Sequence, residues 1–271
     1  MMQQLFRLGK TTFLCPFNCE LYKADFVCIF EKGQVMDNKV EKIIKSANEF
    51  YEALKKDPNS RDRSWEHCYK SFHDARYEEN PDYDYLSLLL AFYLASWGMY
   101  RASSFLIQKD YKVHTPVVEE ILKEKYNCLF GIDCDKLNQS DIKTTLSDID
   151  TIMRDYYRSV RKKVRETEAK YKVSDILITK ILLGTLGCVP AYDQCFVAGL
   201  RELGISSNVN YGEESLSKLV EFYESDKKRF EKTRKKFKAY DLEYPQMKLL
   251  DMGIWQIGAS KQDEKRKKQQ Q

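Results

Sequence analysis

The chain has 271 residues, of which 43% are hydrophobic, 13% aromatic and 32% charged, and its formal net charge is +4. These values are ordinary for a folded soluble protein. The longest apolar run, residues 86–98, is too short and too interrupted to span a bilayer, and the N-terminus lacks the pattern of a signal peptide. We therefore expect a cytoplasmic protein with no membrane partner.

The eight cysteines are too dilute for a disulfide scaffold. Cys15 and Cys19 are spaced as C-x3-C, and Cys128 and Cys134 as C-x5-C. Neither pair has a second pair or a histidine at the spacing of zinc ligands. We expect no metal site and no cofactor.

Hydrophobic periodicity and turn residues predict a mostly α-helical fold, with at most a small strand element near the N-terminus. In chain order the expected elements are a short strand pair within 11–35, then helices at about 39–56, 83–107, 115–126, 142–171, 175–186, directly after Asp193, 214–239 and 244–257. The helix at 83–107 is apolar on nearly every face, which is typical of a central buried helix.

The expected domain organisation has three parts. Residues 1–80 form an N-terminal extension packed on the core, and residues 81–260 form a helical core. Residues 261–271 are polar and charged, cannot bury a core, and are expected to be disordered.

Positive charge is concentrated in two segments. Residues 154–172 contain eight Lys or Arg against three acids, and residues 227–238 contain eight against one. Two solvated helix faces would explain these runs. A basic surface that follows a phosphate backbone would explain them as well.

Residues 178–204 place one acid, Asp193, in a short loop between two apolar helices. An aspartate at a helix start is commonly an N-cap, as Ser174 is expected to be for the preceding helix. Asp193 could therefore be a cap, or it could be a catalytic carboxylate. The order of the surrounding segments bears on this choice.

The stretch resembles the helix-hairpin-helix DNA glycosylase superfamily. In that family a Leu-Pro-Gly-Val-Gly hairpin precedes a helix that ends near a glycine, and a short loop then places the catalytic aspartate at the start of the next helix. Here the break at 173–174, the helix at 176–187 and the loop at 189–193 follow in that order. The apolar and basic positions of the following helix are matched by Phe196, Leu200 and Arg201.

Two further segments are similar to parts of the same family. LAFYLASWGMYR at 90–101 resembles its early buried helix, and MKLLDMGIW at 247–255 resembles its late helix, with an apolar pair, an acid, an apolar residue and glycine. The resemblance spans about 83–257. It implies a glycosylase-like helical fold that binds double-stranded DNA, flips a base out of the stack and breaks its N-glycosidic bond.

The resemblance assigns the catalytic carboxylate to Asp193. The candidate base-pocket residues are Trp97, Tyr100, Tyr192, His67, Trp65 and Gln108. The candidate DNA contacts are Arg101, Lys170, Lys172, Ser174 and Lys180. We expect a monomer on DNA, although the resemblance does not fix the oligomeric state.

The chain departs from the family pattern in ways that narrow the expected activity. The hairpin glycines are replaced by Lys-Tyr-Lys-Val-Ser at 170–174, and Ile176 occupies the position where bifunctional members carry a Schiff-base lysine. No cysteine follows Cys195, so the iron-sulfur loop of some members is absent. The resemblance therefore implies base excision without strand cleavage. The base that we expect is a bulky modified cytosine, such as the glucosylated hydroxymethylcytosine of phage DNA, removed in antiviral defence.

Two other classes of protein remain open. Arg61 and His67 are spaced like the R-x4–6-H motif of the helical HEPN ribonucleases, in which Arg and His cut RNA. A non-enzymatic helical DNA-binding protein would need only the two basic segments.

Overall fold

The computed structural model describes residues 5–8, 11–14, 20–101, 104–164 and 173–269. The chain divides into two compact units, residues 1–41 and residues 42–271. The boundary predicted at residue 80 therefore falls inside the second unit.

The first unit contains a β-hairpin and the beginning of a helix. Strand β1 (Leu5–Leu8) pairs antiparallel with β2 (Thr11–Leu14), with Leu5 opposite Leu14. Helix α1 (Glu20–Lys56) starts in this unit and continues into the second. The strand pair predicted within 11–35 is correct in kind, but most of that segment is helical. Its aromatic and β-branched residues are interspersed with Leu, Ala, Lys and Glu, which are strong helix formers.

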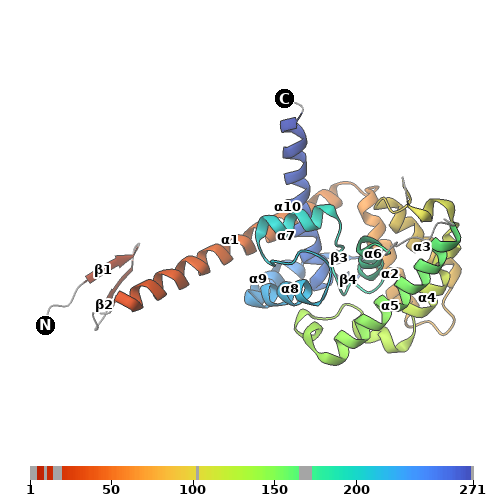
Figure 1. The fold of residues 1–271 in the computed structure, drawn as a ribbon, viewed down its shortest axis with the longest axis horizontal. Coiled ribbons are helices and arrows are strands. Elements are labelled where there is room, and N and C mark those ends of the chain that lie inside the picture. The colour runs from red at the N-terminus through yellow and green to blue at the C-terminus, as the bar shows by residue number, and fades with distance from the viewer. Residues whose placement is uncertain (1–4, 9–10, 15–19, 102–103, 165–172, 270–271) are drawn as a thin grey trace. The chain divides into compact units, whose positions relative to one another are not determined.

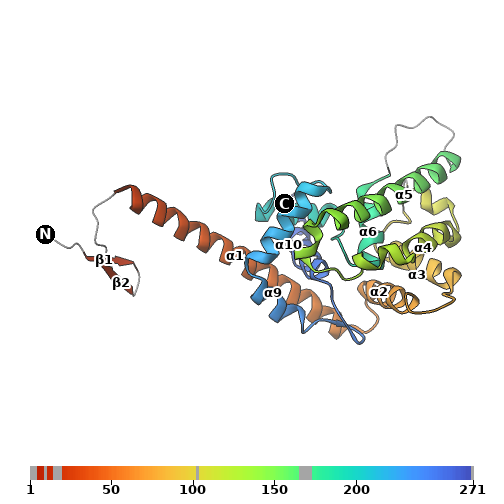
Figure 2. The ribbon, with the colours of Figure 1, turned by 90° about the horizontal axis from the view of Figure 1, so that it is seen from below.

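The second unit is mostly helical, as the sequence predicts (Figures 1 and 2). After α1 its helices are α2 (Ser64–Ala75), α3 (Tyr83–Ser96), α4 (Thr115–Ile121), α5 (Ser140–Val164), α6 (Asp175–Thr185), α7 (Gln194–Leu203), α8 (Glu213–Ser225), α9 (Lys227–Arg234) and α10 (Gln246–Gln269). A short hairpin separates α9 from α10. Its strands β3 (Lys238–Ala239) and β4 (Leu242–Glu243) have two residues each. None of the described helices is both long and apolar enough to cross a membrane.

Helix α6 and the first half of α10 form the buried centre of this unit. Residues 177–192 are buried without interruption, and so are residues 244–254. The long, central buried helix predicted for 83–107 is wrong, because the observed helix is shorter and one of its sides is exposed. Helix α3 ends at Ser96, because Gly98 turns the chain with φ +74°, and Tyr85, Leu88 and Phe92 on one side of α3 are exposed.

Helices α7 and α10 cross at very short range through two glycines. A Cβ atom on Gly199 would lie 2.0 Å from the carbonyl oxygen of Ile254, and one on Gly258 would lie 1.8 Å from that of Cys195. Only glycine allows the two backbones to approach in this way. The crossing brings the start of α7, which Asp193 caps, beside Trp255 of α10.

Several predicted boundaries shift. The basic helix predicted at 214–239 is divided at Asp226, whose side chain caps α9. The helix predicted at 244–257 continues to Gln269, so the charged segment from Lys261, predicted to be disordered, is helical as far as the structure describes it. Helix α5 is described to Val164, and the rest of the helix predicted to residue 171 lies outside the described residues.

Candidate active site

The loop between α6 and α7 is fixed at several points. Gly187 turns the chain with φ +67°, and a Cβ atom there would lie 2.4 Å from Pro245 Cγ. The Ala191 amide donates to Asp251 Oδ1 at 2.9 Å, and the Tyr192 amide donates to Thr179 Oγ1 at 3.0 Å. Asp193 therefore stands at the end of a loop whose backbone is held by both central helices.

Asp193 caps α7, which is one of the two roles that the sequence leaves open. Its Oδ1 atom accepts from the backbone amides of Cys195 and Phe196, both at 3.1 Å. These amides belong to the first turn of the helix, where they have no partner within the helix. The positive end of the helix dipole also favours a negative charge at this position.

The other oxygen of Asp193 has two partners that a cap does not require. Oδ2 accepts from Lys180 Nζ at 3.0 Å and from the indole Nε1 of Trp255 at 3.2 Å. The Lys180 side chain is only 3% exposed, whereas that of Asp193 is 17% exposed. The site is therefore a carboxylate held by four donors and still reached by solvent.

Aromatic rings enclose the ion pair. The ring of Trp97 lies 4.9 Å from Lys180 Nζ and meets Trp255 edge to face, with centroids 5.7 Å apart. The Trp97 indole nitrogen is buried and has no acceptor among the described residues. Both tryptophans are half-buried, so the aromatic wall beside Asp193 is partly accessible.

A second buried ion pair lies next to the first. Lys248 Nζ and Asp251 Oδ2 are 3.0 Å apart, and the two side chains are 4% and 8% exposed. The Lys248 ammonium lies 4.8 Å from the Trp65 ring centroid and 5.9 Å from that of Trp97. Since Asp251 also accepts from the Ala191 amide, this pair anchors the loop that carries Asp193.

Of the six residues predicted for the base pocket, Trp97 lies against both Lys180 and Trp255, the two side chains that donate to Asp193. Trp65 is buried and donates its indole N–H to the Leu183 carbonyl at 2.9 Å, so it reaches the site only through Lys248. Tyr192 is also buried, and its hydroxyl bonds to Ser215 at 2.9 Å. Tyr192 therefore packs into the core rather than forming an open wall.

The other three candidates have different surroundings. The Tyr100 hydroxyl bonds to His114 Nε2 at 2.7 Å, and burial raises the pKa of Tyr100 to about 12. His67 is exposed and bonds to the Tyr240 hydroxyl, and Gln108 is exposed at the end of a short 3-10 helix. Within the described part of the chain, no hydrogen bond or ring contact joins these three to Asp193.

The five residues predicted to contact DNA also have different surroundings. The prediction for Lys180 does not agree with its position, because burial and the ion pair with Asp193 leave it no surface for a phosphate. The Ser174 side chain accepts from the Leu177 amide and caps α6. Arg101 is exposed and makes no ion pair with any residue that the structure describes. Lys170 and Lys172 lie outside the described residues.

The sequence did not point to Lys248 or Trp255 as part of the site. A weak signal exists in the helix at 247–255, where a lysine and an acid three residues apart interrupt an apolar run. Such a pair can be buried only if the two charges meet. The acid in that run, Asp251, belongs to the stretch that resembles the family's late helix, and the resemblance assigns it no role.

The structure gives Arg61 and His67, the two residues of the ribonuclease alternative, separate partners. Arg61 lies over the Trp97 ring, 5.8 Å from its centroid, and pairs with Asp62, whereas His67 bonds to Tyr240. Across the described ranges, no three His, Cys, Asp or Glu side chains gather closely enough to hold a metal ion.

No protein-family model, curated protein or solved structure matches this chain.

Proposed function

We propose that the protein is a DNA N-glycosylase in which the Asp193 carboxylate acts on the N-glycosidic bond. The observation that carries the proposal is the state of this carboxylate. Two backbone amides, an ammonium and an indole hold it in one orientation, and 17% of the side chain is still exposed. A simple cap needs only the two amides.

The chemistry needs a fixed carboxylate. Cleavage of an N-glycosidic bond passes through a sugar with oxocarbenium character, as glycoside hydrolysis does. A negative oxygen beside the sugar stabilises that charge, and the same carboxylate can orient the attacking water and accept its proton. A preorganised carboxylate performs this role without rearrangement in the transition state.

The proposed reaction is base release without strand cleavage. Strand cleavage through a Schiff base needs a free, nucleophilic amine. Ile176 supplies none at the position that the resemblance indicates, and the Lys180 amine is buried and paired with Asp193. The product is therefore an abasic site in an intact strand.

The base must leave the stack before it reaches the carboxylate. Trp97 and Trp255 supply the aromatic wall next to Asp193, and their partial exposure supports a role in receiving the base. Arg101 follows Trp97 closely in the chain and is a candidate phosphate contact. Further candidates are the exposed lysines of the basic segment 227–238, which are Lys228, Lys232, Lys235, Lys236 and Lys238. The substrate that we propose is duplex DNA with a bulky modified cytosine.

The test is an abasic-site assay on end-labelled duplexes that carry cytosine, hydroxymethylcytosine, glucosylated hydroxymethylcytosine or uracil. We expect strand breaks only after alkali, and no covalent complex when borohydride is added. Asp82→Asn is a matched control, because Asp82 also caps a helix, with Oδ1 2.9 Å from the Tyr85 amide. If none of the duplexes released a base, the activity on these bases would be excluded.

A further inference from the structure

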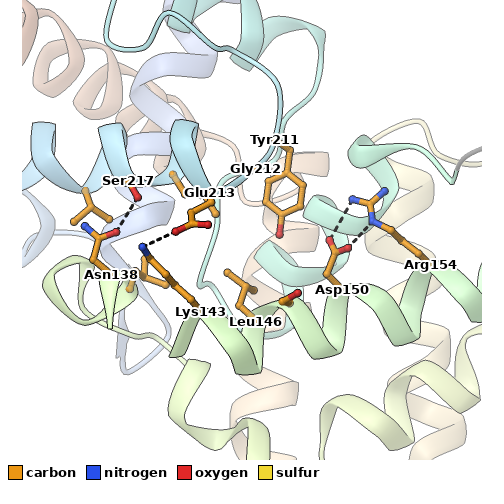
Figure 3. A pocket seen from close by; sticks show the side chains of 13 residues that line it. Asn138, Lys143, Leu146, Asp150, Arg154, Tyr211, Gly212, Glu213 and Ser217 are labelled. Carbon is orange, nitrogen blue, oxygen red and sulfur yellow. Dashed lines mark hydrogen bonds and ion pairs between the residues drawn. The ribbon is translucent and has the colours of Figure 1, made fainter. Parts of the chain in front are cut away.

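A cavity of about 310 Å³ lies between α5 and α8, on residues that the proposed reaction does not use (Figure 3). This volume is at the lower end for small-molecule sites, which begin at about 300 Å³. The inner wall is apolar and buried, from Leu137, Leu146 and Val220, whereas Ser147 at the rim is exposed. The cavity is thus an open pocket with an apolar base.

The charged groups of this pocket neutralise one another. At one end Lys143 Nζ lies 2.8 Å from a carboxylate oxygen of Glu213. At the other end Arg154 bonds to both oxygens of Asp150 (Figure 3). Arg154 also lies 2.8 Å from Asp175, which is outside the lining. The lining holds two cations and two carboxylates, and Asp175 outside it also pairs with Arg154, so the lining has no excess positive charge for a phosphate or a carboxylate of a ligand.

Several neutral groups keep hydrogen-bonding capacity. The ring of Tyr211 packs against Tyr192, with centroids 5.3 Å apart, and its hydroxyl points toward the space between Leu146 and Asp150 (Figure 3). No residue that the structure describes makes a hydrogen bond with this hydroxyl. Burial raises the pKa of Tyr211 well above its ordinary value, so the phenol stays neutral and can donate.

The opposite end of the pocket adds a second set of polar groups. The Asn138 Oδ1 atom accepts from Ser217 Oγ at 2.9 Å. Among the residues that the structure describes, the Asn138 amide hydrogens have no acceptor and the Ser217 oxygen has no donor, so both can bond to a ligand. The Asp150 carboxylate, oriented by Arg154, keeps lone pairs for further donors. Donors and acceptors are therefore spread along an apolar base.

We propose that this pocket binds an uncharged sugar ring. A sugar has an apolar ring face that fits against Leu146 and the other buried residues, and hydroxyl groups that both donate and accept. We place its hydroxyls on Asp150, Tyr211 and Asn138. A free monosaccharide and the sugar of a nucleoside share this chemistry, and the experiment separates them. The inference stands apart from the proposed glycosylase activity, because it uses none of the residues around Asp193.

The test is saturation-transfer NMR on the full chain with glucose and with cytidine as probes, each compared with its phosphorylated form. We expect the neutral probes to bind at millimolar concentration and the phosphorylated ones more weakly. The variant Tyr211→Phe, which keeps the ring and removes the hydroxyl, should weaken binding about 2- to 10-fold. Leu216→Trp, which fills the pocket from α8, should abolish it.

The matched control is Tyr240→Phe, which removes a tyrosine hydroxyl on the β3–β4 hairpin, outside the pocket lining. It should leave binding unchanged. Binding of glucose alone, or of cytidine alone, supports the proposal and identifies the source of the sugar. The proposal is overturned if neither neutral probe binds, if the phosphorylated probes bind more tightly, or if Tyr211→Phe binds as the unmodified chain does while thermal unfolding shows that it is folded.

Discussion

Lys180 Nζ lies 3.0 Å from Asp193 Oδ2, and this pair joins the centre of α6 to the start of α7. The ammonium is almost completely enclosed, and the carboxylate is not. The pair therefore orients the one oxygen of Asp193 that the helix amides leave free. This orientation underlies the proposed catalytic role and gives the first of five predictions.

Lys180→Met should destabilise the protein by about 3 kcal/mol, because it leaves a partly buried carboxylate without its cation. Three other donors still hold Asp193, which keeps the loss near the lower end for a broken buried pair. Chemical denaturation measures the change. Lys143→Met breaks the exposed pair with Glu213 and should cost at most about 1 kcal/mol. Equal losses in the two variants would contradict the structural role of Lys180.

The crossing of α7 and α10 should not tolerate a methyl group. Gly199→Ala and Gly258→Ala each place a Cβ atom within 2.0 Å of a backbone carbonyl oxygen, so each should cost about 3 kcal/mol or more. Gly212→Ala is the control, since a Cβ there meets nothing within 4 Å and the φ of 163° is extended. Thermal unfolding of the three variants should separate Gly212→Ala from the other two. A normal melting temperature for Gly258→Ala would show that the helices are further apart.

The buried pair of Lys248 and Asp251 leads to a prediction about single and double substitutions. Asp251→Asn keeps an oxygen for the Ala191 amide but leaves the Lys248 ammonium buried beside a neutral group. The double variant Lys248→Met/Asp251→Asn should therefore be more stable than Asp251→Asn alone, with a coupling energy of about 1–3 kcal/mol. Urea denaturation of the two single variants and the double variant measures this coupling. Additive losses would mean that the pair contributes nothing as a pair.

His114 should make the protein sensitive to acid. It is fully buried, its ring nitrogens bond to the hydroxyls of Tyr100 and Tyr157, and burial lowers its pKa to about 3. An unfolded histidine has a pKa of about 6.5, so between these two values the unfolded state binds more protons than the folded state. The stability that neutral His114 contributes to the folded state is fully present above about pH 6.5. As the pH falls below this value, the free energy of unfolding decreases by up to about 1.4 kcal/mol per pH unit.

Denaturation curves at pH 7 and pH 5 test this dependence. The unmodified chain should lose about 2 kcal/mol of unfolding free energy over this interval through His114. His114→Gln keeps a donor and an acceptor in the side chain but cannot titrate, so its loss should be smaller by that amount. An identical pH dependence in the two proteins would show that His114 is not held neutral.

The sequence predicted the cap of α6 at Ser174 and the helices on both sides of Asp193, and it offered a cap as one of two roles for Asp193, because these depend on local signals. It did not predict that α3 ends at Ser96 or that α6 is the central helix. Helix α3 contains more apolar residues than α6, and only packing decides which helix is surrounded on all sides.

The site was predictable in part for the same reason. The sequence indicates Asp193 by its position at a helix start, and Trp97 as an aromatic candidate within the stretch 90–101 that resembles the family's early buried helix. Trp255 and Lys248 come from α10, some 60 residues later in the chain than Asp193. Their approach depends on the glycine crossing at Gly199 and Gly258, a tertiary contact with no local signal.

The catalytic role of Asp193 can be separated from its structural role by a variant that removes both charges of the Lys180–Asp193 pair. Asp193→Asn alone still caps α7 but leaves Lys180 without an anion, whereas Lys180→Met/Asp193→Asn removes both charges. Circular dichroism and duplex binding should confirm that the double variant is folded and competent to bind.

The most direct measurement is the single-turnover rate of base release from duplex DNA that carries glucosylated hydroxymethylcytosine. We predict that the unmodified chain and Asp82→Asn release the base, and that Asp193→Asn and the folded double variant are slower by about 10²- to 10⁴-fold. Base release by the double variant at the rate of the unmodified chain would contradict the claim and leave Asp193 as a helix cap.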